Sequence, residues 1–169
     1  MKAEIEKATA VLVGKPLWTC RRAGDMATFQ FGSRVKTLDL KGDPAEVGEY
    51  ALHVQCAWRI ARGDRVAVAS RDLYYPADCG EDEDVPPEFD WDHNPNRRDR
   101  LIGVLFENGR REFLVEGVEA GLAGSLHVAL SDSLSLDVFP DDSFDGEHWR
   151  LFRPDKHARH FVVTGRCAQ

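Results

Sequence analysis

The chain has 169 residues, a formal net charge of −7, an apolar fraction of 43% and a charged fraction of 30%. These values are typical of one folded domain over residues 1–169, and no apolar run approaches the roughly 20 residues of a membrane helix. The negative charge disfavours nucleic acid, which is bound by a clustered basic face. Because the first residues mix both charges and the apolar stretch that follows is short, we expect a cytoplasmic protein without a membrane partner.

The predicted elements begin with a helix over residues 2–12, stopped by Gly14 and Pro16. A hairpin follows, with strands 27–31 and 35–40 joined by a turn at Gly32-Ser33. Residues 50–60 then show the clearest alternation in the chain and predict one strand. One face of this strand is apolar, formed by Tyr50, Leu52, Val54, Cys56, Trp58 and Ile60. A turn at 62–64 leads to a further strand near 66–69.

Residues 76–95 predict a long acidic loop, because prolines interrupt them and residues 76–96 contain no Lys or Arg. Loops longer than about 12 residues in a compact domain are usually functional or disordered. Two aromatic rings in the loop favour partial docking, since they gain free energy by leaving water. The candidate partner-binding residues are Glu81, Asp82, Glu83, Asp84, Phe89, Asp90, Trp91 and Asp92.

Residues 96–107 fit either a helix, with Asn94 as its cap, or a hairpin turning at Asn108-Gly109, and we favour the helix. The chain then alternates as strands over 113–119, 125–130, 134–139, 148–153 and 160–164. The fold class is therefore α+β and β-dominated, with antiparallel sheet and two short helices. Edge pairing of the last strand would make a homodimer, so monomer and homodimer both stay open.

A Trp-Arg strand occurs twice, at Trp58-Arg59 and at Trp149-Arg150, and each copy follows a Gly-Glu pair and an acidic turn. The order of elements suggests an internal duplication of residues 1–75 and 96–169, joined by the acidic loop 76–95. Two ordinary β-meanders with similar patterning explain the same observations. Both interpretations give a β-dominated domain.

Three segments carry a resemblance to a known group of proteins: Gly48 to Ile60, Ser70 to Tyr74, and Trp149 to Phe152 with the closing 161–165. They resemble an uncharacterised family of small bacterial cytosolic proteins, for which the resemblance implies strand packing and no particular activity. In size, acidity and β-content the chain also resembles, in type only, the immunity proteins that neutralise bacterial toxins. The resemblance assigns no functional residue.

The four cysteines, Cys20, Cys56, Cys79 and Cys167, form no Cys-x-x-Cys pair, so we expect reduced thiols and no metal site. The segment 90–94 is similar to the start of a calcium loop, but Pro95 replaces the required Gly and Leu101 the required Glu. The sequence also contains no cofactor fingerprint and no catalytic motif. A nucleophile that pairs Cys56 or Cys79 with a distant His stays open.

The sequence thus favours a binding protein over an enzyme. Our leading hypothesis is recognition of a basic protein partner by the acidic loop, with an immunity role as its sharpest form. The alternative is a polar sheet face that binds a small molecule or a peptide, with weak enzymatic activity left open. That groove would be formed by His53, Gln55, Arg59, His148 and Arg150.

Overall fold

The computed structural model describes residues 1–38, 41–155 and 159–166, so the end of the predicted segment 35–40 and Cys167 lie outside the described residues. Two helices, α1 (Lys2–Thr9) and α2 (Arg97–Leu105), confirm the predicted short helices, and Asn96 rather than Asn94 caps the second. Four 3-10 helices are η1 (Ala10–Leu12), η2 (Ser70–Tyr74), η3 (Glu107–Gly109) and η4 (Leu122–Gly124). The strands are β1 (Pro16–Ala23), β2 (Met26–Leu38), β3 (Pro44–Val54), β4 (Ala57–Arg62), β5 (Arg65–Ala69), β6 (Phe113–Ala120), β7 (Leu126–Leu130), β8 (Leu134–Phe139), β9 (Glu147–Phe152) and β10 (Phe161–Thr164).

All these strands pair antiparallel in one 10-stranded sheet of order β10-β9-β3-β2-β1-β6-β7-β8-β4-β5. The sheet is narrowest between β1 and β6, where only Pro16 with Leu114 and Leu17 with Phe113 are paired in the strand register. One half of the sheet is therefore formed by β10, β9, β3, β2 and β1. The other half is formed by β6, β7, β8, β4 and β5. The α+β, β-dominated, antiparallel fold class is confirmed.

The two halves must lie face to face because of the connection between β3 and β4. These strands are third and ninth in the sheet, yet only Gln55 and Cys56 separate them in the chain. In a flat sheet they would be about 29 Å apart, at about 4.8 Å per strand. The three steps from Val54 to Ala57 span at most about 11 Å, close to the roughly 10 Å between stacked sheets. The sheet is therefore folded over, and the chain crosses from one half to the other.

This crossing corrects the prediction of one continuous strand over residues 50–60. The chain leaves the ladder at Gln55, whose backbone N–H donates to the His148 carbonyl, and the next strand begins at Ala57. The alternation continues through the break because both halves face the same core. Leu52 and Val54 from one half and Trp58 and Ile60 from the other are all buried in it.

The predicted turn at Gly32-Ser33 is also wrong, because β2 continues through these residues without reversing direction. Phe31 pairs with Tyr50 and Arg34 with Gly48, so two residues of β2 oppose the single Glu49 of β3. This is a β-bulge, which takes one extra residue and bends the strand. Gly32 has a φ of +77°, and a Cβ there would lie 2.8 Å from the Glu49 carboxylate. The glycine signals a bulge here rather than a chain reversal.

The core lies between the two halves of the sheet. Phe29 of β2 meets Trp58 of β4 edge to face, with ring centroids 5.0 Å apart at 89°. Trp149 of β9 is fully buried and its indole N–H donates to the Gly124 carbonyl at 2.8 Å. Aromatic rings of this kind bury large apolar areas and dominate core energetics.

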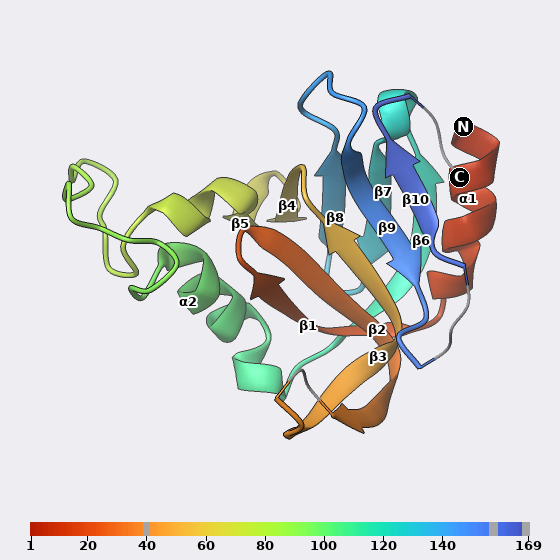
Figure 1. Cartoon of the computed structure of the whole chain (residues 1–169), viewed down its shortest axis with the longest axis horizontal. Helices are drawn as coiled ribbons and strands as arrows, with labels where there is room; N and C mark the ends of the chain where they lie inside the picture. The colour runs from red at the N-terminus through yellow and green to blue at the C-terminus, as the bar shows by residue number, and fades with distance from the viewer. Residues whose placement is uncertain (39–40, 156–158, 167–169) are drawn as a thin grey trace.

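The helices lie at opposite sides of the folded sheet, as Figure 1 shows. On one side α1 and η1 bury Ile5 and Leu12 in the core. On the other side α2 packs near η2, β5 and β1, and Phe106 just after it is buried. The segment 76–96 precedes α2 and projects from this second side.

The strand order interleaves the two proposed repeat units. Strand β4 of the first unit pairs with β8 of the second, and β9 of the second pairs with β3 of the first. The units therefore share ladders rather than forming separate meanders, and internal duplication stays a prediction.

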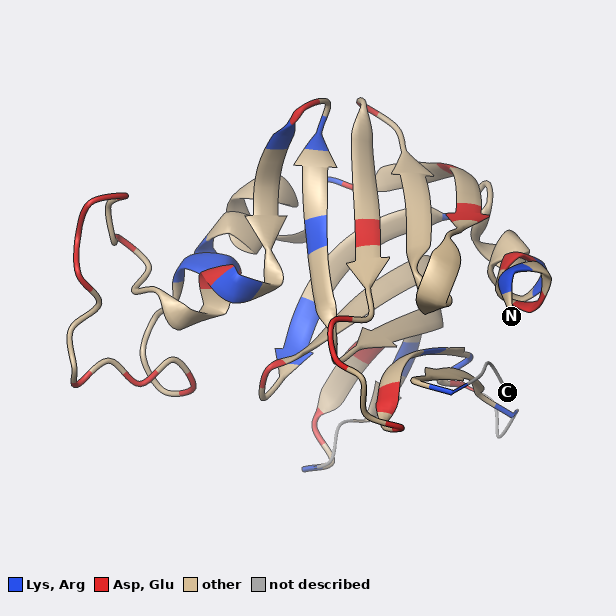
Figure 2. Ribbon diagram, turned by 90° about the horizontal axis from the view of Figure 1, so that it is seen from above, with Lys and Arg blue, Asp and Glu red and all other residues tan. Residues whose placement is uncertain are grey.

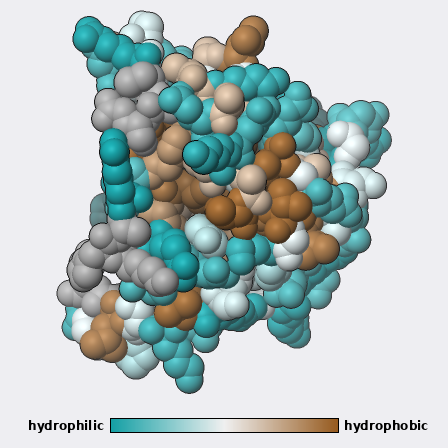
Figure 3. Space-filling model, turned by 90° about the vertical axis from the view of Figure 1, so that its right-hand side faces the viewer, coloured by the Kyte–Doolittle hydropathy of each residue, from teal (hydrophilic) through white to brown (hydrophobic). Residues whose placement is uncertain are grey.

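The face that carries α1 is mainly hydrophilic, with apolar atoms gathered near its centre (Figure 3). Val11 and Val13, which follow α1, are 40% and 48% exposed.

Across the described ranges, neither helix has both the length and the apolar character needed to cross a bilayer.

Truncating the central aromatic contact tests the folded-over core. We expect Trp58→Ala to lower the free energy of unfolding by about 3–5 kcal/mol, because a large buried ring leaves a cavity between the halves. Urea denaturation measures the change. The matched control is Phe144→Ala, since Phe144 is 77% exposed, and its effect should stay within about 0.5 kcal/mol. Equal losses in both variants would contradict a core centred on Trp58.

Candidate functional site: the acidic loop

The segment 76–96 is a closed loop on a short neck. Pro76 and Asn96 form an isolated bridge, the Ala77 N–H donates to the Pro95 carbonyl, and the Arg97 N–H donates to the Tyr75 carbonyl. The two ends of the loop are therefore held side by side, as in Ω-loops, which are frequently functional. The predicted acidic loop is present, and Figure 2 shows its acidic segments extending beyond the sheet.

The carboxylates of the loop are exposed and mostly unpaired. The loop forms two ion pairs within the described chain, Asp92 with Arg22 and Asp90 with His93. Glu83 caps a turn by accepting from the Gly80 N–H at 3.0 Å. The remaining acids are exposed and form no ion pair within the described chain, although Glu81 lines the same hollow as Arg97: Asp78, Glu81, Asp82, Asp84 and Glu88.

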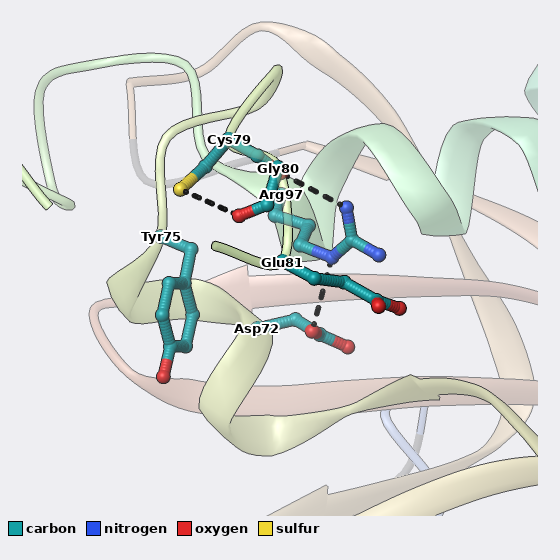
Figure 4. Close-up of a pocket in the computed structure, with 6 residues that line it drawn as sticks. All are labelled: Asp72, Tyr75, Cys79, Gly80, Glu81 and Arg97. Atoms are coloured by element: carbon teal, nitrogen blue, oxygen red, sulfur yellow. Dashed lines mark hydrogen bonds and ion pairs between the residues drawn. The ribbon is translucent and has the colours of Figure 1, made fainter. Parts of the chain in front are cut away.

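The base of the loop rests on η2 and α2 around a hollow of about 210 Å³ (Figure 4). Arg97 of α2 reaches across it, with Nε 3.4 Å from the Asp72 carboxylate and Nη1 donating to the Cys79 carbonyl at 3.5 Å. The buried Cys79 thiol contacts the carbonyls of Gly80 and Glu83. These contacts fix the first part of the loop against the body.

Arg22 of β1 holds the other end of the loop. Its guanidinium donates to the Asp92 carboxylate at 2.7 Å, to the Asp92 carbonyl at 2.9 Å and to the Asp99 carboxylate at 2.9 Å. These bonds raise the pKa of Arg22. One side chain therefore joins β1, the loop and α2. Sequence reasoning missed this residue, because nothing in the local pattern of β1 shows that it faces the loop.

The two aromatic residues of the loop, Phe89 and Trp91, are partly buried, as expected if their rings pack against the protein. Trp91 packs edge to face on Tyr74 of η2, with centroids 5.8 Å apart. Phe89 lines a shallow hollow of about 380 Å³, whose other walls come from three loop prolines and from Ala77, Asp78, Glu88 and Asn94. Prolines fix the backbone around this hollow. The loop thus presents a mainly apolar depression that also has two acidic residues, Asp78 and Glu88, in its lining.

The end of the loop nearest α2 contains a titratable contact. His93 Nδ1 lies 2.8 Å from the Asp90 carboxylate, which raises the pKa of His93, and the same hydrogen bond lowers the pKa of Asp90. The Asp90 carboxylate also accepts from the Asp92 N–H, and Asn94 accepts from the Asp90 N–H. This local network orders the turn that carries Trp91.

The five residues of the predicted groove are only partly brought together. His53 of β3 and Arg150 of β9 are register partners, and Gln55 joins them through Glu147, to which it donates at 3.0 Å. His148 is buried beside them in β9. Arg59 lies on β4, next to Asp137 of β8 at 3.1 Å, and β4 is adjacent to neither β3 nor β9.

His53 is the most perturbed group on this sheet face. Its ring meets Phe152 edge to face at 4.7 Å, and its Nδ1 is enclosed without a hydrogen-bond partner in the described chain. Burial lowers the pKa of His53 to about 4, and the charges of Arg150 and His160 act in the same direction. The group is therefore neutral near pH 7, and Arg150 is left as the cation of this face.

Burial also suppresses the chemistry of two thiols. The pKa values of Cys20 and Cys56 are each raised to about 12, with burial as the largest cause. Because the thiolate is the nucleophilic form, Cys56 is a poor nucleophile at neutral pH. A search of the described part of the chain finds no group of His, Cys, Asp and Glu arranged to hold a metal ion.

In comparisons with known proteins, no family model, no curated protein and no solved structure matches this chain.

The buried state of His53 predicts an acid dependence of stability. In the unfolded chain the pKa is about 6.5, whereas in the folded chain it is about 4. As the pH falls, His53 therefore takes up a proton in the unfolded state before it does so in the folded state. Its contribution to the free energy of unfolding is complete above about pH 6.5 and is lost as the pH falls toward 4. We expect the urea midpoint to fall over this range, and to fall less in His53→Phe, which keeps a ring beside Phe152. An NMR titration that places His53 near 6.5 would contradict this account.

Removing the Arg22 clamp should loosen one end of the loop. We expect Arg22→Ala to speed amide hydrogen exchange in residues 88–95 by about fivefold for each kcal/mol of local stability that is lost. Exchange measured by mass spectrometry reports this change. Arg59→Ala, which removes a similar ion pair on β4, is the control and should leave the loop unchanged. Unaltered exchange in Arg22→Ala would show that the clamp is not needed for loop order.

Proposed function

We propose that the protein is a binding protein that presents the loop 76–96 to a basic surface of a partner protein. The observation that carries this proposal is the combination of unpaired, exposed carboxylates with a loop whose ends are held in place. Unpaired carboxylates attract a basic partner over distances of about a Debye length. A loop that is already ordered loses little conformational entropy when it binds.

The apolar hollow beside Phe89 supplies the short-range part of recognition. Interface energy is concentrated in a few well-packed apolar contacts, while surrounding charges set the association rate and the choice of partner. A hollow of about 380 Å³ suits one apolar or long basic side chain. The partner segment therefore combines Lys or Arg with an apolar residue. An immunity role is one form of this function.

Matched charge variants test the proposal with a displayed library of short random peptides as the probe. Wild type is expected to enrich peptides that combine basic and apolar residues. The variant Glu81→Gln/Asp82→Asn/Glu88→Gln should bind these peptides with an association rate about tenfold lower at low ionic strength. The control Glu112→Gln/Asp64→Asn/Glu116→Gln changes the net charge equally, at exposed acids outside the loop.

Surface plasmon resonance separates the two parts of the interface. Loss of loop charge should act on the association rate, whereas Phe89→Ala should raise the dissociation rate. Equal loss of binding in the loop and control triple variants would show that only the net charge matters. It would overturn the proposal that the loop is the binding site. Enrichment of peptides without basic residues would overturn the partner class.

A further inference from the structure

Arg98 is a buried cation whose bonds are incomplete. It is the second residue of α2 and only 2% exposed. Nη1 donates to the backbone carbonyl of Asp25 at 3.0 Å, while no acceptor for the enclosed Nη2 is found in residues 1–38, 41–155 and 159–166. A buried charge is costly unless it is paired and hydrogen-bonded. This guanidinium can therefore gain substantially from an additional acceptor.

The nearest carboxylate does not neutralise Arg98. Asp99 Oδ1 lies 3.9 Å from its Nε, and Asp99 Oδ2 already accepts from Arg22 and from Asn96, each at 2.9 Å. Arg98 also lies at the N-terminus of α2, where the helix dipole is positive and disfavours a cation. Burial lowers the pKa of Arg98, and the charge of Arg22 acts in the same direction, whereas Asp99 acts in the opposite one. An anionic group beside Arg98 would relieve both effects.

Arg98 lines a pocket of about 280 Å³, separate from the hollows of the acidic loop. The walls come from distant parts of the chain: the β1–β2 turn, the β3–β4 crossing, η2, α2 and the segment after β8. Ser70 and Tyr74 add hydroxyl groups. The volume is slightly below the roughly 300–1,000 Å³ typical of small-molecule pockets, which suits a ligand with few atoms.

Two carboxylates in the same pocket narrow the ligand class. Asp25 and Asp141 both line it, and Asp141 Oδ1 accepts from the Ala57 N–H at 3.1 Å. Arg71 is a second cation in the lining, so the two arginines and the two aspartates balance in formal charge and give a multiply charged anion such as phosphate no net attraction. A ligand that carries one carboxylate and one ammonium group complements both kinds of side chain together.

We propose that this pocket binds a free α-amino acid, with its carboxylate on the Arg98 guanidinium and its ammonium group held by Asp25 and Asp141. The site is independent of the protein partner proposed for the acidic loop. It is also distinct from the His53 sheet face, since none of the groove residues except Gln55 lines it.

Free amino acids added singly to the full-length chain are the probes, with acetate and methylamine as the separated halves of the ligand. At ten times its dissociation constant a binding amino acid should raise the Tm by about 4 °C. In two-dimensional NMR it should shift the signals of Arg98, Ser70 and Ala57. Acetate and methylamine should each bind at least about tenfold more weakly.

Asp25→Asn is expected to weaken the amino acid about tenfold or more, since it removes a charged acceptor. Asp64→Asn is the matched control, because Asp64 follows a glycine of positive φ in the β4–β5 turn just as Asp25 does in the β1–β2 turn. Arg98→Lys should abolish binding of the amino acid. If Arg98→Lys does not fold, Asp25→Asn still tests the proposal. Binding of acetate as tight as that of any amino acid, or binding unchanged in Asp25→Asn, would overturn the proposal. So would the absence of any response to all amino acids at 50 mM, which would show that the pocket binds water only.

Discussion

The two-residue crossing between β3 and β4 is the constraint on which the rest of the structure depends. It joins the third and ninth strands of a ten-stranded sheet, so the sheet can form only by folding over at the narrow β1–β6 junction. Large sheets generally curl or split into two packed layers, because one apolar face must be covered. Here the covering layer is the other half of the same sheet. The contact between Phe29 and Trp58 is the direct result.

A sheet folded in this way leaves its sides open, and the helices close them. On one side α1 and η1 bury apolar residues, whereas α2 and η2 close the other side with a mixture of apolar and charged groups. Arg98 is buried there because the helix that carries it also packs Leu101, Ile102 and Leu105 against the core. The acidic loop leaves from the same side, since it connects η2 to α2. Both proposed binding sites are therefore consequences of how one side of the sheet is closed.

Much of this fold is predictable from local pattern, because strand alternation and helix ends depend on neighbouring residues. The second-half strands, the helix near 97–105 and the acidic loop all follow from such signals. The break at Gln55 does not follow from such signals, because the alternation of apolar and polar residues continues across it. The bulge at Gly32 does not either, because Gly-Ser is equally typical of a turn. The burial of Arg98 and the clamp at Arg22 depend on residues about 70 positions distant. Pattern in a single sequence does not report such contacts.

The distribution of charge links the loop to the helix behind it. Within 76–96 there is no Lys or Arg, so every guanidinium that holds the loop comes from β1 or α2. Several of these bonds go to backbone carbonyls, as when Arg100 donates to Ala77 and Arg97 to Cys79. Because these arginines bond to backbone carbonyls, they anchor the loop without neutralising its carboxylates. The outer carboxylates therefore stay available for a partner. The positive charge is consequently collected at the base of the loop, next to the pocket where Arg98 lacks a full set of acceptors.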